Sequence, residues 1–253
     1  MDCNVRIIIL AALASAFLAG CETDGSNPLT DRAPLAPEIA KAGRDLPDLP
    51  PPEEFVDEID NPYLAFERGK VFIYEGETEE GFERIVVEVT SRNKTILGVR
   101  TTVVHDQAFL NGALIEDTFD WYAQDSDGIV WYFGEDTKEI GEHGEVIGTE
   151  GSWEAGVNGA LPGIIMLADP EVGDRYQQEF AEDVAEDMAR VRSLSATVEV
   201  PYGMFENCLQ TLEWTPLEPG AREYKYYAPE VGQVLEETAG AGGDRIELKE
   251  IQD

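Results

Sequence analysis

Two aspartates at positions 125 and 127 are the residues in this sequence that most directly suggest metal binding. The segment Asp125-Ser126-Asp127-Gly128 holds two carboxylates two residues apart, ahead of a glycine that can adopt a positive φ. Ca²⁺ takes roughly six to eight oxygen ligands, and Asp-x-Asp-Gly is a common start of its binding loops. Asp120, Glu135 and Asp136 are further candidate ligands.

A plain turn explains the same four residues without any metal. A type I turn favours Asp at its first position and Gly at its last for conformational reasons alone. The EF-hand pattern also fails, because Asp136 stands where that loop needs a glutamate. We therefore prefer the plain turn and expect no cofactor, with a Ca²⁺ site as the alternative.

Four aromatic residues flank the same segment and form a candidate ligand platform. Trp121 and Tyr122 precede the turn, and Trp131 and Tyr132 follow it, so an aromatic lies on each face of both strands. If one face is exposed, the rings offer a flat surface on which a glycan or a peptide could stack. If both faces are covered, the rings are core, and cross-strand aromatic pairs stabilise a sheet without any ligand.

The motif content favours a protein without enzymatic activity over a hydrolase. The two histidines, His105 and His143, have no spacing typical of a catalytic triad or a zinc site. His105 is expected at a strand end and His143 in an exposed turn. Paired carboxylates could serve a glycosidase, but with 52 acidic residues any fold brings some of them together.

A net charge of −34 limits the partners of the folded part. Such a field argues against binding nucleic acid or anionic lipid headgroups, and it favours cations, a basic protein partner or simple solubility. The sequence has three cysteines. Cys208 lies in a strand-like segment and is expected to be a buried, unreactive thiol, so the domain is held together without a disulfide.

The elements that position these residues read as short strands separated by Gly, Pro, Asn and Asp. We expect an all-β, mainly antiparallel fold, either a curved sheet, a half-barrel or a sandwich, with at most one or two short helices. Asn111-Gly112 predicts a hairpin, and Gly98 a bulge within a strand over 95–104. The expected strands are 71–76, 84–89, 95–104, 119–123, 129–133, 205–212, 233–238 and 245–251.

Two segments fit this pattern less well. Residues 156–174 read as a long connection that covers one end of the sheet. Residues 176–191 have a helix-like composition, yet both flanks read as strands, so two strands with a turn near Glu182 are slightly preferred to a helix.

The N-terminus carries an apolar run over 7–18, which is too short to span a bilayer and has the length of a signal-peptide core. It ends in Leu18-Ala19-Gly20-Cys21, which resembles the lipobox of bacterial lipoproteins. The resemblance implies that residues 1–20 are a signal peptide and that Cys21 carries diacylglyceryl and palmitate chains. It implies an extracytoplasmic location in the cell envelope, and Glu22 favours the outer membrane in a Gram-negative source.

Residues 21–60 are rich in proline and acidic side chains, and this composition predicts an extended, disordered tether without a helix. Residues 61–253 are then expected to form one β domain.

Several sequence blocks also resemble a family of secreted bacterial lipoproteins: Asp120–Asp125, Val130–Glu135, Gly151–Gly156, Glu213–Gly220 and Tyr226–Gly232. The pattern from Gly203 to Gly232 is similar to envelope lipoproteins with curved antiparallel half-barrels. These resemblances imply a fold and a location but no reaction. The expected role is binding or carrying a hydrophobic small molecule, or envelope maintenance; a Ca²⁺- or glycan-binding module on residues 119–136 is the alternative.

Overall fold

Alternating apolar and polar residues produce long antiparallel strands through most of the described chain. The computed structural model describes residues 48–64, 66–240 and 242–253. One short 3-10 helix, η2 (Pro52–Glu54), precedes the strands in the described part. The strands are β1 (Val71–Thr78), β2 (Gly81–Ile96), β3 (Val99–Leu110), β4 (Ala113–Gln124), β5 (Val130–Ile140), β6 (Val146–Gly148), β7 (Trp153–Glu154), β8 (Leu161–Met166), β9 (Arg175–Gln177), β10 (Glu179–Phe180), β11 (Met188–Val200), β12 (Gly203–Trp214), β13 (Glu223–Ala228), β14 (Gly232–Thr238) and β15 (Arg245–Gln252).

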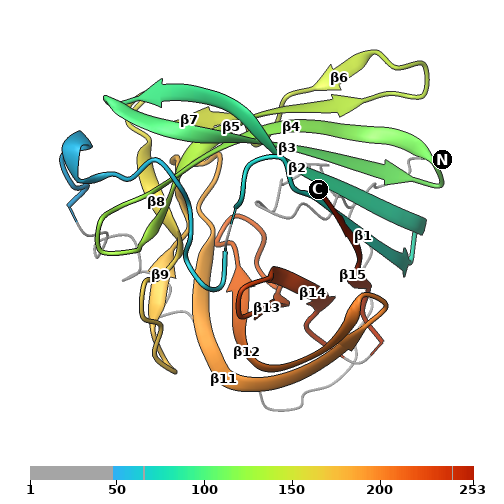
Figure 1. The fold of residues 1–253 in the computed structure, drawn as a ribbon. Coiled ribbons are helices and arrows are strands. Elements are labelled where there is room, and N and C mark those ends of the chain that lie inside the picture. Colours follow the sequence, from blue (N-terminus) through green and yellow to red (C-terminus); the bar gives the residue numbers. More distant parts are fainter. Residues whose placement is uncertain (1–47, 65, 241) are drawn as a thin grey trace, which may run out of the picture.

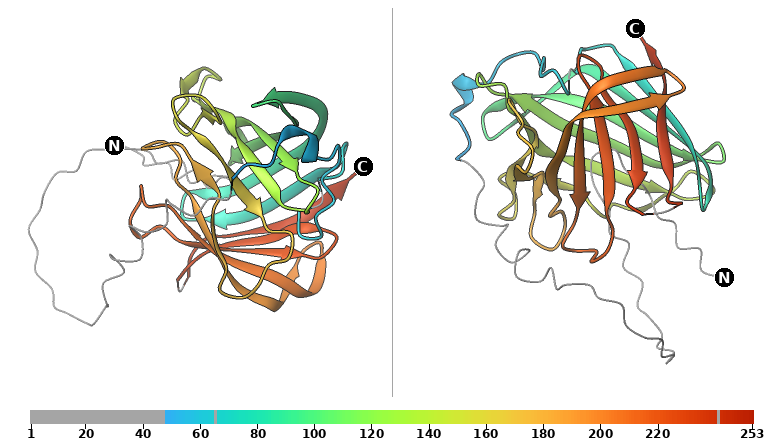
Figure 2. Two further views of the ribbon diagram at one scale, coloured as in Figure 1. Left: turned by 90° about the vertical axis from the view of Figure 1, so that its left-hand side faces the viewer. Right: turned by 90° about the horizontal axis from the view of Figure 1, so that it is seen from below.

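All of these strands belong to one curled sheet (Figure 1). Hydrogen-bonded neighbours follow the order β10-β8-β5-β4-β3-β2-β1-β15-β14-β13-β12-β11-β9, and β6 and β7 pair with β5. The two ends of this order, β9 and β10, are separated in the chain by Gln178 alone. The sheet therefore curls back on itself into a nearly closed barrel (Figure 2), and the prediction of an all-β, curved antiparallel fold is confirmed.

The hairpin turns follow local sequence with one exception. Asn111 and Gly112 have φ of 51° and 85°, and they connect Leu110 to its partner Ala113 as predicted. Gly98, in contrast, is not a bulge. Leu97 and Gly98 have φ of 50° and 86° and form the turn between β2 and β3. The prediction was wrong because Leu97 continues an apolar run and is an unusual residue for a turn that needs positive φ at both positions.

The segment over 156–174 is not simply a connection, because it contains β8. This strand pairs with β5 through Ile164 and Trp131, and Ile164, Ile165 and Met166 are buried. Residues 176–191 contain no helix. They form β9, β10 and the start of β11, with a turn between the bridged residues Ala181 and Ala185, so the preferred two-strand interpretation is confirmed.

Residues 48–60, which composition assigns to the tether, contact the barrel. Phe55 bridges Asp125, and its ring lies 5.9 Å from that of Phe133; Ile59 is buried. These two apolar side chains anchor a segment whose prolines and acids indicate an extended chain. The expectation that this segment holds no helix was wrong, because it contains η2. Residues 1–47, with the leader, Cys21 and the rest of the tether, lie outside the described residues. No helix in the described part is both long and apolar enough to cross a membrane.

Candidate functional site

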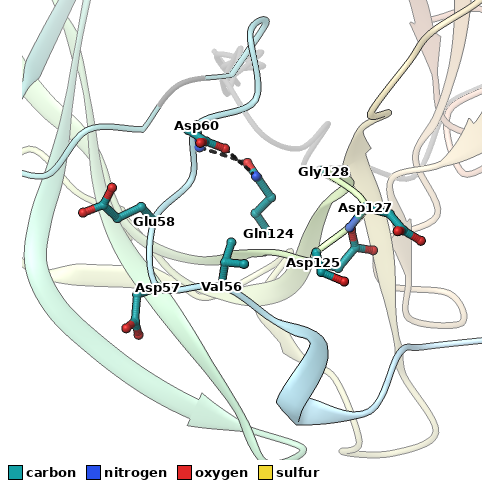
Figure 3. A pocket seen from close by; sticks show the side chains of 9 residues that line it. Val56, Asp57, Glu58, Asp60, Gln124, Asp125, Asp127 and Gly128 are labelled. Carbon is teal, nitrogen blue, oxygen red and sulfur yellow. Dashed lines mark hydrogen bonds between the residues drawn. The ribbon is translucent and has the colours of Figure 1, made fainter.

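An acidic groove lies between the N-terminal segment and the β4–β5 turn (Figure 3). It has a volume of about 580 Å³. Gln124 holds its two walls together, because Oε1 accepts hydrogen bonds from the backbone N–H of Asp60 and Asn61, both at 2.9 Å. Its lining consists of Val56, Asp57, Glu58, Asp60, Gln124, Asp125, Ser126, Asp127 and Gly128.

Asp125 uses its carboxylate to build the turn. Its Oδ1 accepts the backbone N–H of Asp127 at 3.0 Å and of Ile129 at 2.9 Å, and its Oδ2 accepts Nε1 of Trp131 at 2.8 Å. The side chain is buried, and three of its roughly four lone-pair sites accept hydrogen bonds from this turn. The sequence Asp-Ser-Asp-Gly is therefore explained as a turn stabilised by an aspartate side chain.

The other candidate cation ligands do not converge on this turn. Asp120 and Glu135 point into the barrel, where both lie near the hydroxyl of Tyr132. Asp136 is exposed and pairs with Lys138 at 3.1 Å, while Asp127 is exposed at the groove. Within the described residues, no group of three or more His, Cys, Asp or Glu side chains is placed to hold a metal ion. The predicted Ca²⁺ site at these positions is thus not assembled.

The four aromatic residues of the expected platform are core residues. Trp121, Tyr122, Trp131 and Tyr132 are each at most 6% exposed. The rings of Tyr122 and Tyr132 stack at 4.7 Å, and the ammonium group of Lys94 covers the Trp121 ring at 3.2 Å. The platform interpretation was wrong because the curled sheet and the side chains of neighbouring strands cover both faces of the hairpin.

The interior of the barrel contains a set of buried acidic side chains that sequence reasoning missed. Lys225 is the one buried basic side chain in the described part of the chain. The signal was present: Asp106 shares the period-two phase of the buried residues Val104 and Ala108. The buried carboxyl groups are those of Glu83, Asp106, Glu116, Asp120, Asp125, Glu135, Glu179, Asp187, Glu213, Glu223 and Glu236.

Burial changes the ionisation of these carboxyl groups. Loss of hydration raises the pKa of Glu116 to about 8 and the pKa values of Glu83 and Asp120 to about 7. Burial, reinforced by the nearby charge of Asp120, holds the pKa of Glu135 well above its usual range. The interior is therefore partly protonated at neutral pH, which reduces the repulsion between its acids.

Lys225 neutralises a second group of acids near β12–β14. Its Nζ lies 2.9 Å from Glu223, 3.3 Å from Glu213 and 3.7 Å from Glu236. Burial alone would lower the pKa of Lys225, but these three glutamates raise it. One charged amine thus holds three neighbouring strands together from inside.

The cavity found among the inward-facing side chains of the described strands is small. An enclosed cavity of about 30 Å³ lies between the apolar side chains of Leu64, Val104 and Ile165 and the carboxyl groups of Asp106 and Asp120. This volume admits about one water molecule. It cannot hold an acyl chain or a sugar.

The histidines and the folded domain's cysteine are placed outside any pocket. His105 lies in the middle of β3, so the prediction of a strand end was wrong. On the outer face of that strand, its Nε2 is 2.7 Å from Oδ1 of Asp117 and its ring stacks on Phe119 at 4.3 Å. His105 therefore has a carboxylate partner, yet it lines neither the acidic groove nor the enclosed cavity. His143 is exposed in the β5–β6 turn. Cys208 is fully buried, as predicted, and burial raises the pKa of its thiol.

No protein-family model and no curated protein sequence matches this chain. Two solved structures are similar to it. One is a protein from Bacteroides fragilis described as exported and of YmcC-like fold, with 16% identity and a TM-score of 0.45; the match covers 76% of this chain and 99% of that one. The other is a protein from Parabacteroides distasonis described as a lipoprotein, with 10% identity, a TM-score of 0.43 and the same coverage.

Proposed function

We propose that this chain is a lipid-anchored, extracytoplasmic protein of the bacterial cell envelope, and that its β domain works without enzymatic activity, through contacts of its outer surface. The packed interior supports the second part of this proposal, a role of the outer surface without enzymatic activity. A cavity of about 30 Å³ leaves no room for a substrate or a carried ligand inside the barrel. A role in envelope maintenance is therefore preferred to the carriage of a hydrophobic molecule.

The resemblance of Leu18-Ala19-Gly20-Cys21 to a lipobox supports the first half. A single acyl chain binds a membrane reversibly, whereas two or more chains give stable anchoring. A diacylglyceryl group on Cys21 would therefore hold a strongly acidic domain beside a bilayer without help from the domain. In a Gram-negative source, Glu22 supports placement in the outer membrane.

The carrier hypothesis requires an open apolar concavity, and side chains of β8 occupy the inside of the sheet instead. Ile164 and Met166 belong to the packed core, and Ile165 lines the small enclosed cavity. The hydrolase hypothesis lacks support for a related reason, because the carboxyl groups of Asp106 and Asp120 face a space too small for a substrate.

Two measurements test the proposal. Radiolabelled palmitate supplied to the producing bacterium should enter the wild-type chain, and a Cys21→Ala variant should incorporate none and leave the membrane fraction. A matched Cys208→Ala variant should still be labelled and fractionate as the wild type does. Unlabelled wild-type protein, or a Cys21→Ala variant that stays in the membrane fraction, would contradict the anchor.

Native mass spectrometry of the protein purified from that bacterium tests the surface role. We expect one mass, that of the polypeptide with its acyl chains. A further bound molecule that is released on unfolding would contradict a filled interior.

A further inference from the structure

One outer face of the barrel is basic and aromatic although the chain as a whole is strongly acidic. The face comprises the outward side of β9, β11, β12 and β13, which are neighbours in the sheet (Figure 1). It holds Arg175, Arg190, Arg192 and Arg222, together with Trp214 and Tyr224. We refer to these six residues as the arginine face.

The arginines of this face have no acidic partner. None of the four makes an ion pair among the described residues, although the sequence contains 52 acids. Where these strands lie beside one another, the outward positions 175, 188, 190, 192, 210, 212, 214, 224 and 226 carry no Asp or Glu, whereas Glu199 and Glu206 are exposed farther along β11 and β12. Glu213 and Glu223, at the inward positions of this region, face Lys225.

Two of these arginines stand in a destabilising arrangement. Arg190 lies directly opposite Arg175 in the antiparallel ladder. Like charges at such positions repel, and an acidic residue at either one would relieve the repulsion. The guanidinium group of Arg175 instead lies 5.3 Å from the ring centroid of Trp214. Repulsion that no ion pair among the described residues relieves indicates a surface that could serve in binding.

We propose that the arginine face rests on anionic phospholipid headgroups of the leaflet that holds the lipid anchor, and so orients the domain on the membrane. Arginines pair with phosphate groups, and tryptophan and tyrosine are enriched at the membrane interface. Each basic side chain near an anionic bilayer favours binding by roughly fivefold. At physiological salt, charges are screened over about 8 Å, so acidic side chains that lie farther than this from the arginine face weaken the attraction little.

This inference rests on the proposed anchor at Cys21, because four arginines alone would bind a bilayer weakly. The anchor supplies the high local concentration that makes a weak contact effective. Asp48, where the described domain begins, lies 27 residues after Cys21. At about 3.1 Å per residue such a chain can extend far enough to let any face of the domain reach the bilayer.

Trp214 provides an internal reporter for this contact. The other three tryptophans, Trp121, Trp131 and Trp153, are at most 6% exposed, whereas Trp214 is half-buried at the surface. The full-length lipidated protein would be reconstituted in vesicles whose phosphatidylglycerol is brominated near the headgroup, and in vesicles of brominated phosphatidylcholine. We expect quenching of tryptophan emission in the anionic vesicles, and loss of that quenching at high salt and in Trp214→Phe.

A pair of double variants separates the arginine face from net charge. Arg175→Gln with Arg190→Gln should lose the quenching. Arg92→Gln with Lys249→Gln removes the same charge from exposed residues of β2 and β15 and should keep it. Three outcomes would overturn the inference while the anchor stands. The protein could float with anionic vesicles and show no quenching, the quenching could be equal in the two lipids, or it could be equal in the two double variants. Protein that does not float with the vesicles overturns the anchor and the inference together.

Discussion

The hydroxyl oxygen of Tyr132 lies 2.6 Å from Oδ1 of Asp120, in the acidic interior of the barrel. The same hydroxyl lies 3.0 Å from Oε2 of Glu135. A tyrosine has one hydroxyl hydrogen, so it can donate to only one of these carboxyl groups. Burial and the nearby Asp120 raise the pKa of Glu135, which favours its protonated form; in that form Glu135 can donate to the Tyr132 oxygen while Tyr132 donates to Asp120. The three side chains thus form a short hydrogen-bonded chain between β4 and β5.

Tyr132→Phe should destabilise the domain by about 1–3 kcal/mol, because it leaves the carboxyl groups of Asp120 and Glu135 buried without their shared partner. The free energy of unfolding in urea measures the loss. Tyr202→Phe removes the hydroxyl of a tyrosine that is 45% exposed and should change stability little. Equal stability of Tyr132→Phe and the wild type would show that the hydrogen-bonded chain contributes nothing.

Stability should fall as pH rises from about 4.5 to about 8. The folded-state pKa values of Glu83, Glu116 and Asp120 lie above their ordinary values, so the folded state binds more protons than the unfolded state across this range. Their contribution is complete below the ordinary pKa and is lost as pH rises through about 7 to 8. Urea midpoints at several pH values across this range measure the slope.

Glu116→Gln tests the carboxyl group whose pKa is raised the most among these three. It should reduce the slope by up to about 1.4 kcal/mol per pH unit between the ordinary and the raised pKa. Glu206→Gln, at an exposed position of β12, is the matched control and should leave the slope unchanged. Stability that rises steadily up to pH 8 would contradict the sign of this prediction.

Lys225→Met should destabilise the domain by about 3–5 kcal/mol, because it removes the one buried cation from three glutamates. Adding Glu223→Gln to this variant should restore part of the loss, since it removes one of the unbalanced charges. Lys249→Met, at an exposed position, should change the free energy of unfolding by less than about 0.5 kcal/mol. No recovery in the double variant would show that the loss comes from packing of the lysine chain.

Asp125→Asn should cost about 1–3 kcal/mol, because an amide cannot accept hydrogen bonds at both of its terminal atoms and Trp131 Nε1 would lose its partner or face a donor. Asp127→Asn, at the exposed neighbour, should be close to neutral. Thermal unfolding with and without Ca²⁺ completes the test: we expect no Ca²⁺-dependent shift in the wild type. A shift that Asp125→Asn and Asp127→Asn both abolish would restore the cation site.

Local sequence was sufficient for much of the fold because strand and turn signals act over a few residues. Alternating side chains between 71 and 89, the Asn111-Gly112 pair and the Asp125–Gly128 turn each determine their element through backbone preference and hydrogen bonds close in the chain. The same local logic failed at Leu97, an apolar residue with a φ of 50° in the β2–β3 turn, whose side chain lies against Gly156.

The functional reading depended on tertiary structure, because burial is decided by which strands meet across the barrel. Sequence placed Trp121, Tyr122, Trp131 and Tyr132 in one hairpin, but only the curled sheet covers both of its faces. Sequence likewise showed an excess of acids without showing that Asp106, Asp120 and Glu135 face inward while Arg175 and Arg190 meet on the outside. The sequence of a strand shows which side chains share a face. The residues that cover each face come from strands far away in the chain, so only the tertiary structure shows which face is buried.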